Sequence, residues 1–253
     1  MSEADFWNIA GILHLADNEQ PGAITEKLHK VLAFQQMMEL KWVQNYKYPQ
    51  NLALDEAIIP YSGRLSFLQF IHNKPTRWGI KAFLLSSSAT GYTYKMKIYS
   101  GKEGEGLSTR ELVEEMVAPL ENQAYILYLD NFYTSVELLK SLRRKKIRCS
   151  GTLRKNRIKN TDLVASFKKF SKGEMKFYTD ESEQELTLLL WKDKKDVVFL
   201  SNHRGDEIDE VRKTRKVKGK EVEEVKQVPA IRTHYNQKAR GVDLSNQLCQ
   251  TFR

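Results

Sequence analysis

Three aspartates lie at or near the ends of predicted strands or at the start of a predicted helix, where a carboxylate can reach a common surface. Asp55 lies in "NLALDEAIIPYS", Asp130 follows the apolar run "AYILYL", and Asp243 opens the last predicted helix in "GVDLSNQ". Oxygen ligands of this kind suit Mg²⁺ or Mn²⁺. Two such ions about 3.5–4 Å apart can activate an attacking oxygen and stabilise a leaving one. If the three carboxylates meet, they predict chemistry at a phosphodiester bond.

Each aspartate also has an ordinary structural interpretation. The Asp-Asn pair at 130–131 is a typical turn sequence, and Asp243 could simply cap its helix. Glu56 competes for the first position, and the acids from Asp206 to Glu210 compete for the third. A carboxylate cluster that faced nucleic acid would repel the phosphates unless cations neutralised it. The carboxylate set therefore makes sense together with metal ions.

The first half of the chain predicts a helix, a strand and a hairpin. Apolar residues recur at helical spacing over 24–46, which indicates an amphipathic packing helix. A short strand follows, with Asp55 at or near its end and Pro60 closing it. Residues 79–99 hold two β-rich runs around the polar turn "SSSATG". Together, the strand that contains Asp55 and the two β-rich runs give three early strands, which we expect to be antiparallel.

The segment from 108 to 154 predicts helix, strand, helix and strand. Residues 108–120 carry one apolar helical face and lead into the strand that ends at Asp130. Thr134 and Glu137 then have the spacing of a capping box, and the cations from Arg143 to Lys146 suit the end of that helix. The last strand is "IRCSGTLR".

This order indicates a mixed α/β fold with a ribonuclease-H-like mixed sheet flanked by helices. In such a sheet the first and fourth strands are neighbours, so Asp55 and Asp130 could meet at their ends. A charge-dense stretch interrupts the pattern. The predicted organisation is a helical lead-in, the first part of the catalytic domain, an insertion domain, and the final part of the catalytic domain, over residues 1–47, 48–157, 158–228 and 229–253.

Two segments of the predicted insertion have readable patterns. "WKDKKDVVFLSNH" indicates a strand pair, and "VRKTRKVKGKEVEEVK" is an exposed charged run. The basic part of that run is compatible with a nuclear-import or phosphate-contacting patch, although its composition favours a solvated loop.

Composition favours a globular, basic protein. Lys and Arg number 41 against 32 Asp and Glu, a net charge of +9 that favours polyanionic partners. The two cysteines and five histidines form no zinc-ligand pattern, so we expect no zinc domain within this chain. The acidic N-terminus lacks the features of a secretory signal, and no apolar run approaches membrane-spanning length, so no membrane partner is expected.

Five motifs in this order resemble the transposase domain of the piggyBac family: "NLALDEAIIPYSGR", "NKPTRWGIK", "YLDNFYTSVELLKSL", "GTLRKNR" and "YNQKARGVDLSNQ". The resemblance covers residues 48–157 and 190–250. It implies that Asp55, Asp130 and Asp243 are the catalytic and metal-binding acids of that family. It also implies a ribonuclease-H-like fold interrupted before the third aspartate.

The activity that the resemblance implies is cut-and-paste DNA transposition. The transposon end is nicked, the freed 3′-hydroxyl attacks the other strand to form a hairpin, and the end later joins a TTAA target. Double-stranded DNA is the expected partner, with a second copy of the chain as a further candidate, and the expected location is the nucleus. Arg64, Lys74, Arg77 and Lys81 lie in the family's basic motifs and are candidate DNA contacts, for which ordinary surface charge is an equally good account.

Two departures from the family pattern bear on activity. Asn246 stands where some piggyBac enzymes carry a further aspartate, and an amide is a poorer metal ligand. Active relatives also continue into more helix and usually a cysteine-rich zinc domain, so we expect a truncated or domesticated derivative. A non-catalytic DNA-binding or chromatin-associated derivative of a transposase is the alternative, as is an enzyme that nicks DNA without joining strands.

Overall fold

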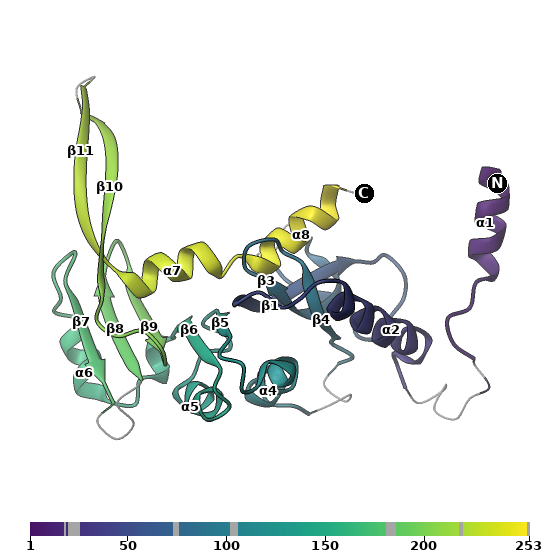
Figure 1. The fold of residues 1–253 in the computed structure, drawn as a ribbon, viewed down its shortest axis with the longest axis horizontal. Coiled ribbons are helices and arrows are strands. Elements are labelled where there is room, and N and C mark those ends of the chain that lie inside the picture. Colours follow the sequence, from purple (N-terminus) through teal and green to yellow (C-terminus); the bar gives the residue numbers. More distant parts are fainter. Residues whose placement is uncertain are drawn as a thin grey trace.

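In the computed structural model, the fold is built around one extended sheet with helices on both faces (Figure 1). The structure describes residues 1–17, 19, 26–72, 76–101, 106–180, 186–217 and 220–251. The helices are α1 (Glu3–Ile12), α2 (His29–Asn45), α4 (Thr109–Val117), α5 (Val136–Arg144), α6 (Thr161–Phe167), α7 (Ala230–Lys238) and α8 (Gly241–Thr251), with single 3₁₀ turns at Ala118–Leu120 and Lys155–Arg157.

The main sheet has nine strands in the order β2-β3-β1-β5-β6-β9-β8-β7, with β4 paired to β3. Its centre is parallel, because β5 pairs in parallel with both β1 and β6, whereas the other pairs are antiparallel. The strands are β1 (Asn51–Pro60), β2 (Gln69–Phe70), β3 (Trp78–Ser87), β4 (Thr93–Ile98), β5 (Ile126–Leu129), β6 (Arg148–Thr152), β7 (Met175–Thr179), β8 (Thr187–Lys192) and β9 (Asp196–Ser201).

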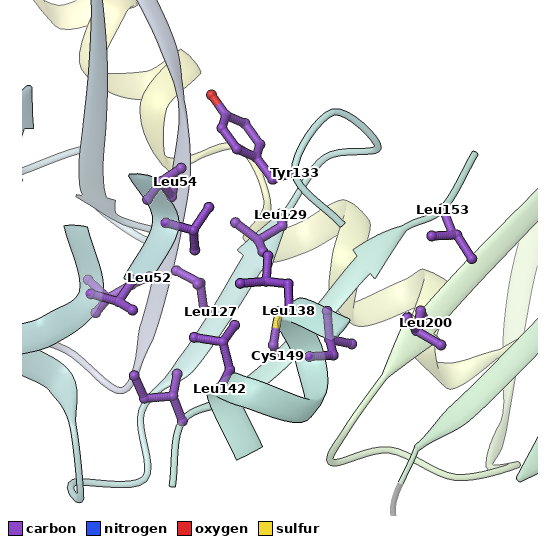
Figure 2. Packing of buried hydrophobic residues seen from close by; sticks show 14 of the residues in the cluster. Leu52, Leu54, Leu127, Leu129, Tyr133, Leu138, Leu142, Cys149, Leu153 and Leu200 are labelled. Atoms are coloured by element: carbon purple, nitrogen blue, oxygen red, sulfur yellow. The ribbon is translucent and has the colours of Figure 1, made fainter. Parts of the chain in front are cut away.

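Alternation along β1 and β5 divides their side chains between the two faces. Leu52 and Leu54 of β1 join Leu127 and Leu129 of β5 in the main core, which α4 and α5 cover (Figure 2). The opposite face of β1 carries Ala53 and other small residues, which allow the backbone of α8 to approach closely. The sheet is therefore buried on both sides near its centre.

The predicted order of elements from the long N-terminal helix to β6 is confirmed, with three local corrections. Asp55 lies in the middle of β1 and not near its end, because the strand continues to Pro60 along β3 after its pairing with β5 stops. Ser135, not Thr134, caps α5, since its hydroxyl accepts a hydrogen bond from the amide of Leu138 at 3.2 Å. The Thr134 hydroxyl instead donates to the carbonyl oxygen of Asp130 at 2.7 Å.

The third correction concerns the charged run that composition assigned to a loop. It forms a two-stranded antiparallel hairpin of β10 (Ile208–Val217) and β11 (Lys220–Pro229), which projects from the main sheet (Figure 1). Five valines between 211 and 228 supply the β-propensity that the charge content hides. The strand pair predicted in 191–203 is confirmed in part as β8 and β9. The domain boundaries at 47, 157 and 228 remain predictions, and β9 pairs directly with β6 across the second of them.

The N-terminal helices have little buried surface. The helix predicted over 24–46 begins at His29, and Ile24 lies outside the described residues. No residue of α1 or α2 is fully buried. Side chains of α2 bind β4 at its edge, where Gln35 donates to the carbonyl of Met96 at 2.6 Å and Glu39 accepts from its amide at 2.9 Å. Among the described residues, no helix is long and apolar enough to cross a membrane.

The main core predicts a sharp difference between two leucine substitutions. Leu127→Ala removes a fully buried side chain between α5 and the sheet, and should lower the free energy of unfolding by about 2–5 kcal/mol. Leu248→Ala, on the exposed side of α8, should change it by less than about 0.5 kcal/mol. Urea unfolding of both variants measures the difference, and equal losses would contradict this description of the core.

Candidate active site

The three predicted aspartates line one cavity of about 370 Å³. Asp55 comes from β1, Asp130 follows β5, and Asp243 lies in the first turn of α8. The cavity is completed by side chains from the sheet, α7 and the turn before α8: Leu54, Tyr128, Tyr235, Asn236, Ala239 and Arg240. Aspartates separated by up to 188 positions thus line one cavity, and their role as a catalytic site stays a prediction.

Strand register brings Asp55 and Asp130 together. Leu54 is the partner of Leu129 in the parallel ladder, so the next residue of each strand is an aspartate at the same edge. Both carboxylates are held locally by backbone amides. The Oδ1 atom of Asp55 accepts from the amide of Glu56 at 2.8 Å, and that of Asp130 accepts from the amide of Phe132 at 2.7 Å.

Two arginines support the turn that follows Asp130, and Arg154 donates to the side-chain oxygen of Asn131 at 3.0 Å. The guanidinium of Arg157 donates to the carbonyl oxygens of Asn131, Phe132 and Thr134 at 3.1, 2.9 and 2.6 Å. These three carbonyls belong to the "DNFYTS" motif, so Arg157 of "GTLRKNR" is a structural partner of that motif. Charge-assisted bonds of this kind hold a turn in one geometry.

Asp243 depends on how closely α8 approaches the sheet. A Cβ atom on Gly241 would lie 2.7 Å from the carbonyl oxygen of Ser87, and one on Gly91 would lie 2.6 Å from the amide nitrogen of Ser245. The hydroxyl of Thr93 bonds that of Ser245 at 3.0 Å and that of Ser86 at 3.1 Å. The "SSSATG" turn and Thr93 after it therefore form the surface against which the first turns of α8 pack. We call this contact the seat of α8.

The cavity has a negative electrostatic character. Burial raises the pKa of the Asp130 carboxyl, and the nearby charge of Glu56 raises it further, against the lowering effect of the Phe132 amide. Burial together with the charges of Asp130 and Asp55 raises the pKa of Tyr235 to about 12. A buried carboxylate beside other acids is stabilised by a cation.

The competing acids do not line this cavity. Glu56 is adjacent to Asp55 and so points to the other face of β1, where its carboxylate accepts a hydrogen bond from the buried hydroxyl of Tyr133 at 3.0 Å. Asp206 to Glu210 lie at the start of β10, and none of them contributes to the cavity. The placement favours Asp55 and Asp243 over these alternatives.

Sequence reasoning missed Tyr235, Asn236 and Arg240. Tyr235 and Asn236 lie on α7, and Arg240 lies in the turn to α8 and supplies the positive charge among the lining residues. All three belong to the motif "YNQKARGVD", in which only the aspartate was assigned a role. Their spacing of one and four residues places them on one side of a helical segment, which is the signal that could have found them.

The four predicted DNA contacts lie away from this cavity or outside the described residues. Arg64 and Arg77 are exposed, at the loop after β1 and just before β3. Lys81 is half-buried, with Nζ 4.9 Å from the ring centroid of Phe83 and 5.4 Å from that of Phe132. Lys74 falls outside the described residues. Their contact with DNA stays a prediction.

Comparison with known proteins defines the class of this fold and site. A family model described as "Transposase IS4" matches residues 1–253. A solved structure of a piggyBac transposase synaptic complex with hairpin DNA is similar over 99% of this chain and 51% of its own, with a TM-score of 0.80 and 26% identity. The chain is a transposase domain, and the ribonuclease-H-like α/β fold expected from the sequence is confirmed.

The curated relatives specify the group. The human "PiggyBac transposable element-derived protein 3" is 28% identical over 98% of this chain and 43% of its own length. The human "PiggyBac transposable element-derived protein 2" is 27% identical over 82% of this chain and 36% of its own. The chain belongs to the piggyBac transposase family, as its motifs predicted, and spans about half the length or less of these relatives.

The seat of α8 predicts a strong effect of one methyl group. Gly91→Ala places its Cβ against the backbone of α8 at a φ of +72°, so α8 must shift and carry Asp243 with it. We expect a loss of about 1–3 kcal/mol in the free energy of unfolding and faster amide exchange over 241–251. Gly173→Ala is the matched control, because its φ is +92° with no atom within 4 Å. Slow amide hydrogen exchange over 241–251 in both variants would contradict the close packing of α8 against Gly91.

The buried Asp130 predicts a stability that falls as pH rises. Its folded-state pKa is raised above the usual 3.8, so the folded chain holds this proton more tightly than the unfolded chain. In the metal-free protein, Asp130→Asn should therefore be more stable than wild type at about pH 7, with the difference closing towards about pH 4.

Asp193→Asn is the control, and at neutral pH it should change stability in the opposite direction to Asp130→Asn. Pairing with Lys226 lowers the pKa of Asp193, so Asp193→Asn should be less stable than wild type at about pH 7 and lose that deficit as the pH falls through the lowered pKa. Urea midpoints across this range measure both variants. An Asp130→Asn protein that is less stable than wild type at neutral pH would show that the carboxylate is not strained by burial.

Proposed function

We propose that this chain is the catalytic domain of a piggyBac-type transposase that cleaves and transfers DNA strands through Asp55, Asp130 and Asp243. One observation carries the proposal: carboxylates from β1, β5 and α8 line a single cavity beside Arg240. The net charge of +9 supports a polyanionic substrate. The similar solved transposase is bound to hairpin DNA, which supports double-stranded DNA with processed ends as the substrate class.

The residues that line the cavity suit divalent cations. Aspartate oxygens are preferred ligands of Mg²⁺ and Mn²⁺, and the desolvated Asp130 gains from a cation beside it. Across the described residues, no three His, Cys, Asp or Glu side chains are gathered closely enough to hold an ion in the present arrangement. When bound, two ions would activate an attacking oxygen and stabilise a leaving one.

The chain's own residues would orient the DNA. Asp55 and Asp130 are held on neighbouring strands by backbone amides, which makes them the rigid half of the site. Asp243 is exposed on α8 and completes the set. Arg240, in the turn before α8, is placed to bind a phosphate beside the carboxylates. TTAA as the target, assembly of two copies and action in the nucleus belong to the same proposal.

Metal binding is the first test. Calorimetry with Mn²⁺ should show binding to the wild-type chain and its loss in Asp130→Asn. Asp206→Asn is the matched control, since Asp206 is an exposed acid away from the cavity, and it should bind as wild type does. Equal binding by all three proteins, with and without a DNA hairpin, would contradict the metal site.

Strand cleavage is the second test, and it separates the catalytic domain from a non-catalytic DNA-binding derivative. With Mn²⁺ and duplex ends, the wild-type chain should give nicked, hairpin and joined products on a denaturing gel. Asp55→Asn, Asp130→Asn and Asp243→Asn should each lower the rate of strand cleavage by more than about 100-fold. A loss of up to about 100-fold is what substitution of a supporting residue near a metal site typically causes. DNA binding without products in the wild type would favour the non-catalytic derivative, and nicks alone would favour the nicking enzyme.

A further inference from the structure

Two aromatic side chains lie exposed at the β2–β3 edge of the sheet. Phe70 is 50% exposed and Trp78 is 60% exposed. They are direct partners in the β2–β3 ladder, with ring centroids 5.1 Å apart and planes tilted by 47°. Contiguous exposed apolar surface is one mark of an interaction site.

The pair lies on the same face of the sheet as Asp55. The β1–β3 ladder runs without a break from Asp55 opposite Leu84 to Pro60 opposite Gly79, so alternate residues of β3 back to Trp78 share the face of Leu84. Trp78 is one residue beyond Gly79, the partner of Pro60, and is therefore six residues along the ladder from Asp55. At about 3.3 Å per residue, the pair lies roughly 20 Å from the candidate site.

A groove runs from the candidate site toward the aromatic pair and reaches Thr76, two residues before Trp78. It has a volume of about 740 Å³ and is lined by Asp243 of the candidate site, by Ala57 and Ile59 of β1, and by Thr76 just before Trp78. Its other lining residues are mainly apolar or aromatic side chains of α2 and the sheet on one side and mainly polar side chains of α8 on the other: Trp42, Ile58, Leu84, Tyr92, Thr93 and Met96, and Ser245, Asn246, Gln247, Cys249 and Gln250. A groove that is apolar on the sheet side and polar on the α8 side suits both the flat faces and the polar edges of unpaired bases.

The charge of this edge suits a polyanion. No Asp or Glu occurs between Glu56 and Glu103, a segment that includes β2, β3 and β4. Arg64 and Arg77 are exposed cations of the same segment. A strand of DNA could therefore place its phosphates near cations and its bases against the groove.

We propose that Phe70 and Trp78 form a stacking platform for an unpaired base of the DNA strand that leaves the candidate active site. The proposal shares its DNA partner with the proposed function and is independent of the metal chemistry. About six nucleotide steps at 3.4 Å per step cover the roughly 20 Å between the two places. Continuity with Asp243 and the absence of acids favour DNA over a second copy of the chain.

The test measures binding of DNA with an unpaired end in EDTA, where no metal contributes. Fluorescence anisotropy compares a blunt duplex with one that carries a single-stranded overhang. Trp78→Ala should weaken overhang binding by about fivefold to 150-fold and leave blunt binding unchanged. Trp78→Phe keeps a ring and should restore most of the loss. Trp7→Ala is the matched control, because Trp7 is 64% exposed on α1 and should have no effect.

A cross-linking experiment locates the base. 5-Iodo-deoxyuridine at each overhang position should, on irradiation, cross-link to Phe70 or Trp78 at one position, as read by mass spectrometry. Cross-links elsewhere, or equal losses for overhang and blunt DNA in Trp78→Ala, would overturn the platform. Light scattering that shows Trp78→Ala converting a dimer to a monomer would assign the pair to a contact between copies instead.

These outcomes are separable from those of the proposed function. Asp130→Asn should abolish strand cleavage, and in EDTA it should keep the wild-type ratio of overhang affinity to blunt affinity. A wild-type chain that stacks the base and never cuts DNA would retain the platform and overturn the catalytic role. A wild-type chain that cuts DNA, with overhang binding that does not depend on Trp78, would retain the catalytic role and overturn the platform.

Discussion

The candidate site depends on the parallel pairing of β1 with β5. That ladder sets Leu54 beside Leu129 and so makes neighbours of two aspartates far apart in the chain. The same alternation sends Leu52, Leu54, Leu127 and Leu129 into the core beneath α4 and α5. A shift of one residue would turn the leucines to the opposite face and the aspartates into the core, so core packing and site geometry are held by one register.

The second constraint is the close approach of α8 to the opposite face. Small residues and hydroxyls allow it: Gly91 and Gly241 remove side chains that would collide, and Ser86, Thr93 and Ser245 bond to one another. The first turn of α8 therefore lies directly over β1 and β3. The exposed third aspartate owes its position to atoms several residues away from it.

The site also shows a conflict between stability and function. A carboxylate at Asp130 is partly desolvated and lies near the charge of Glu56, which raises its pKa. Arg157 holds the turn through its backbone carbonyls, and the Asp130 carboxylate adds a hydrogen bond from the Phe132 amide. Groups that cost stability and line a cavity are typical of functional sites. The same face of the sheet continues along the groove toward the exposed rings of Phe70 and Trp78, so the surface used by the substrate would extend beyond the three acids.

The sequence by itself determined the local elements and the chemistry available to them. Apolar alternation and helical periodicity predicted the strands around Asp55 and Asp130 and the helix that carries Asp243, because these signals depend on neighbours along the chain. Local signals failed where two interpretations were close in energy. The cap of α5 moved from Thr134 to Ser135, and the charged run from Arg212 onwards became a strand, because cross-strand pairing outweighed composition.

Only the tertiary structure decided which residues share the cavity. No periodicity in the sequence encodes the register of β1 against β5, the seat of α8 on the β3–β4 turn, or the position of Tyr235 and Arg240 beside the aspartates. These arrangements arise from contacts between segments distant in the chain, where packing and backbone pairing of the whole sheet select one arrangement. The acids were therefore readable as candidates from their types and positions, and their common site is a property of the fold.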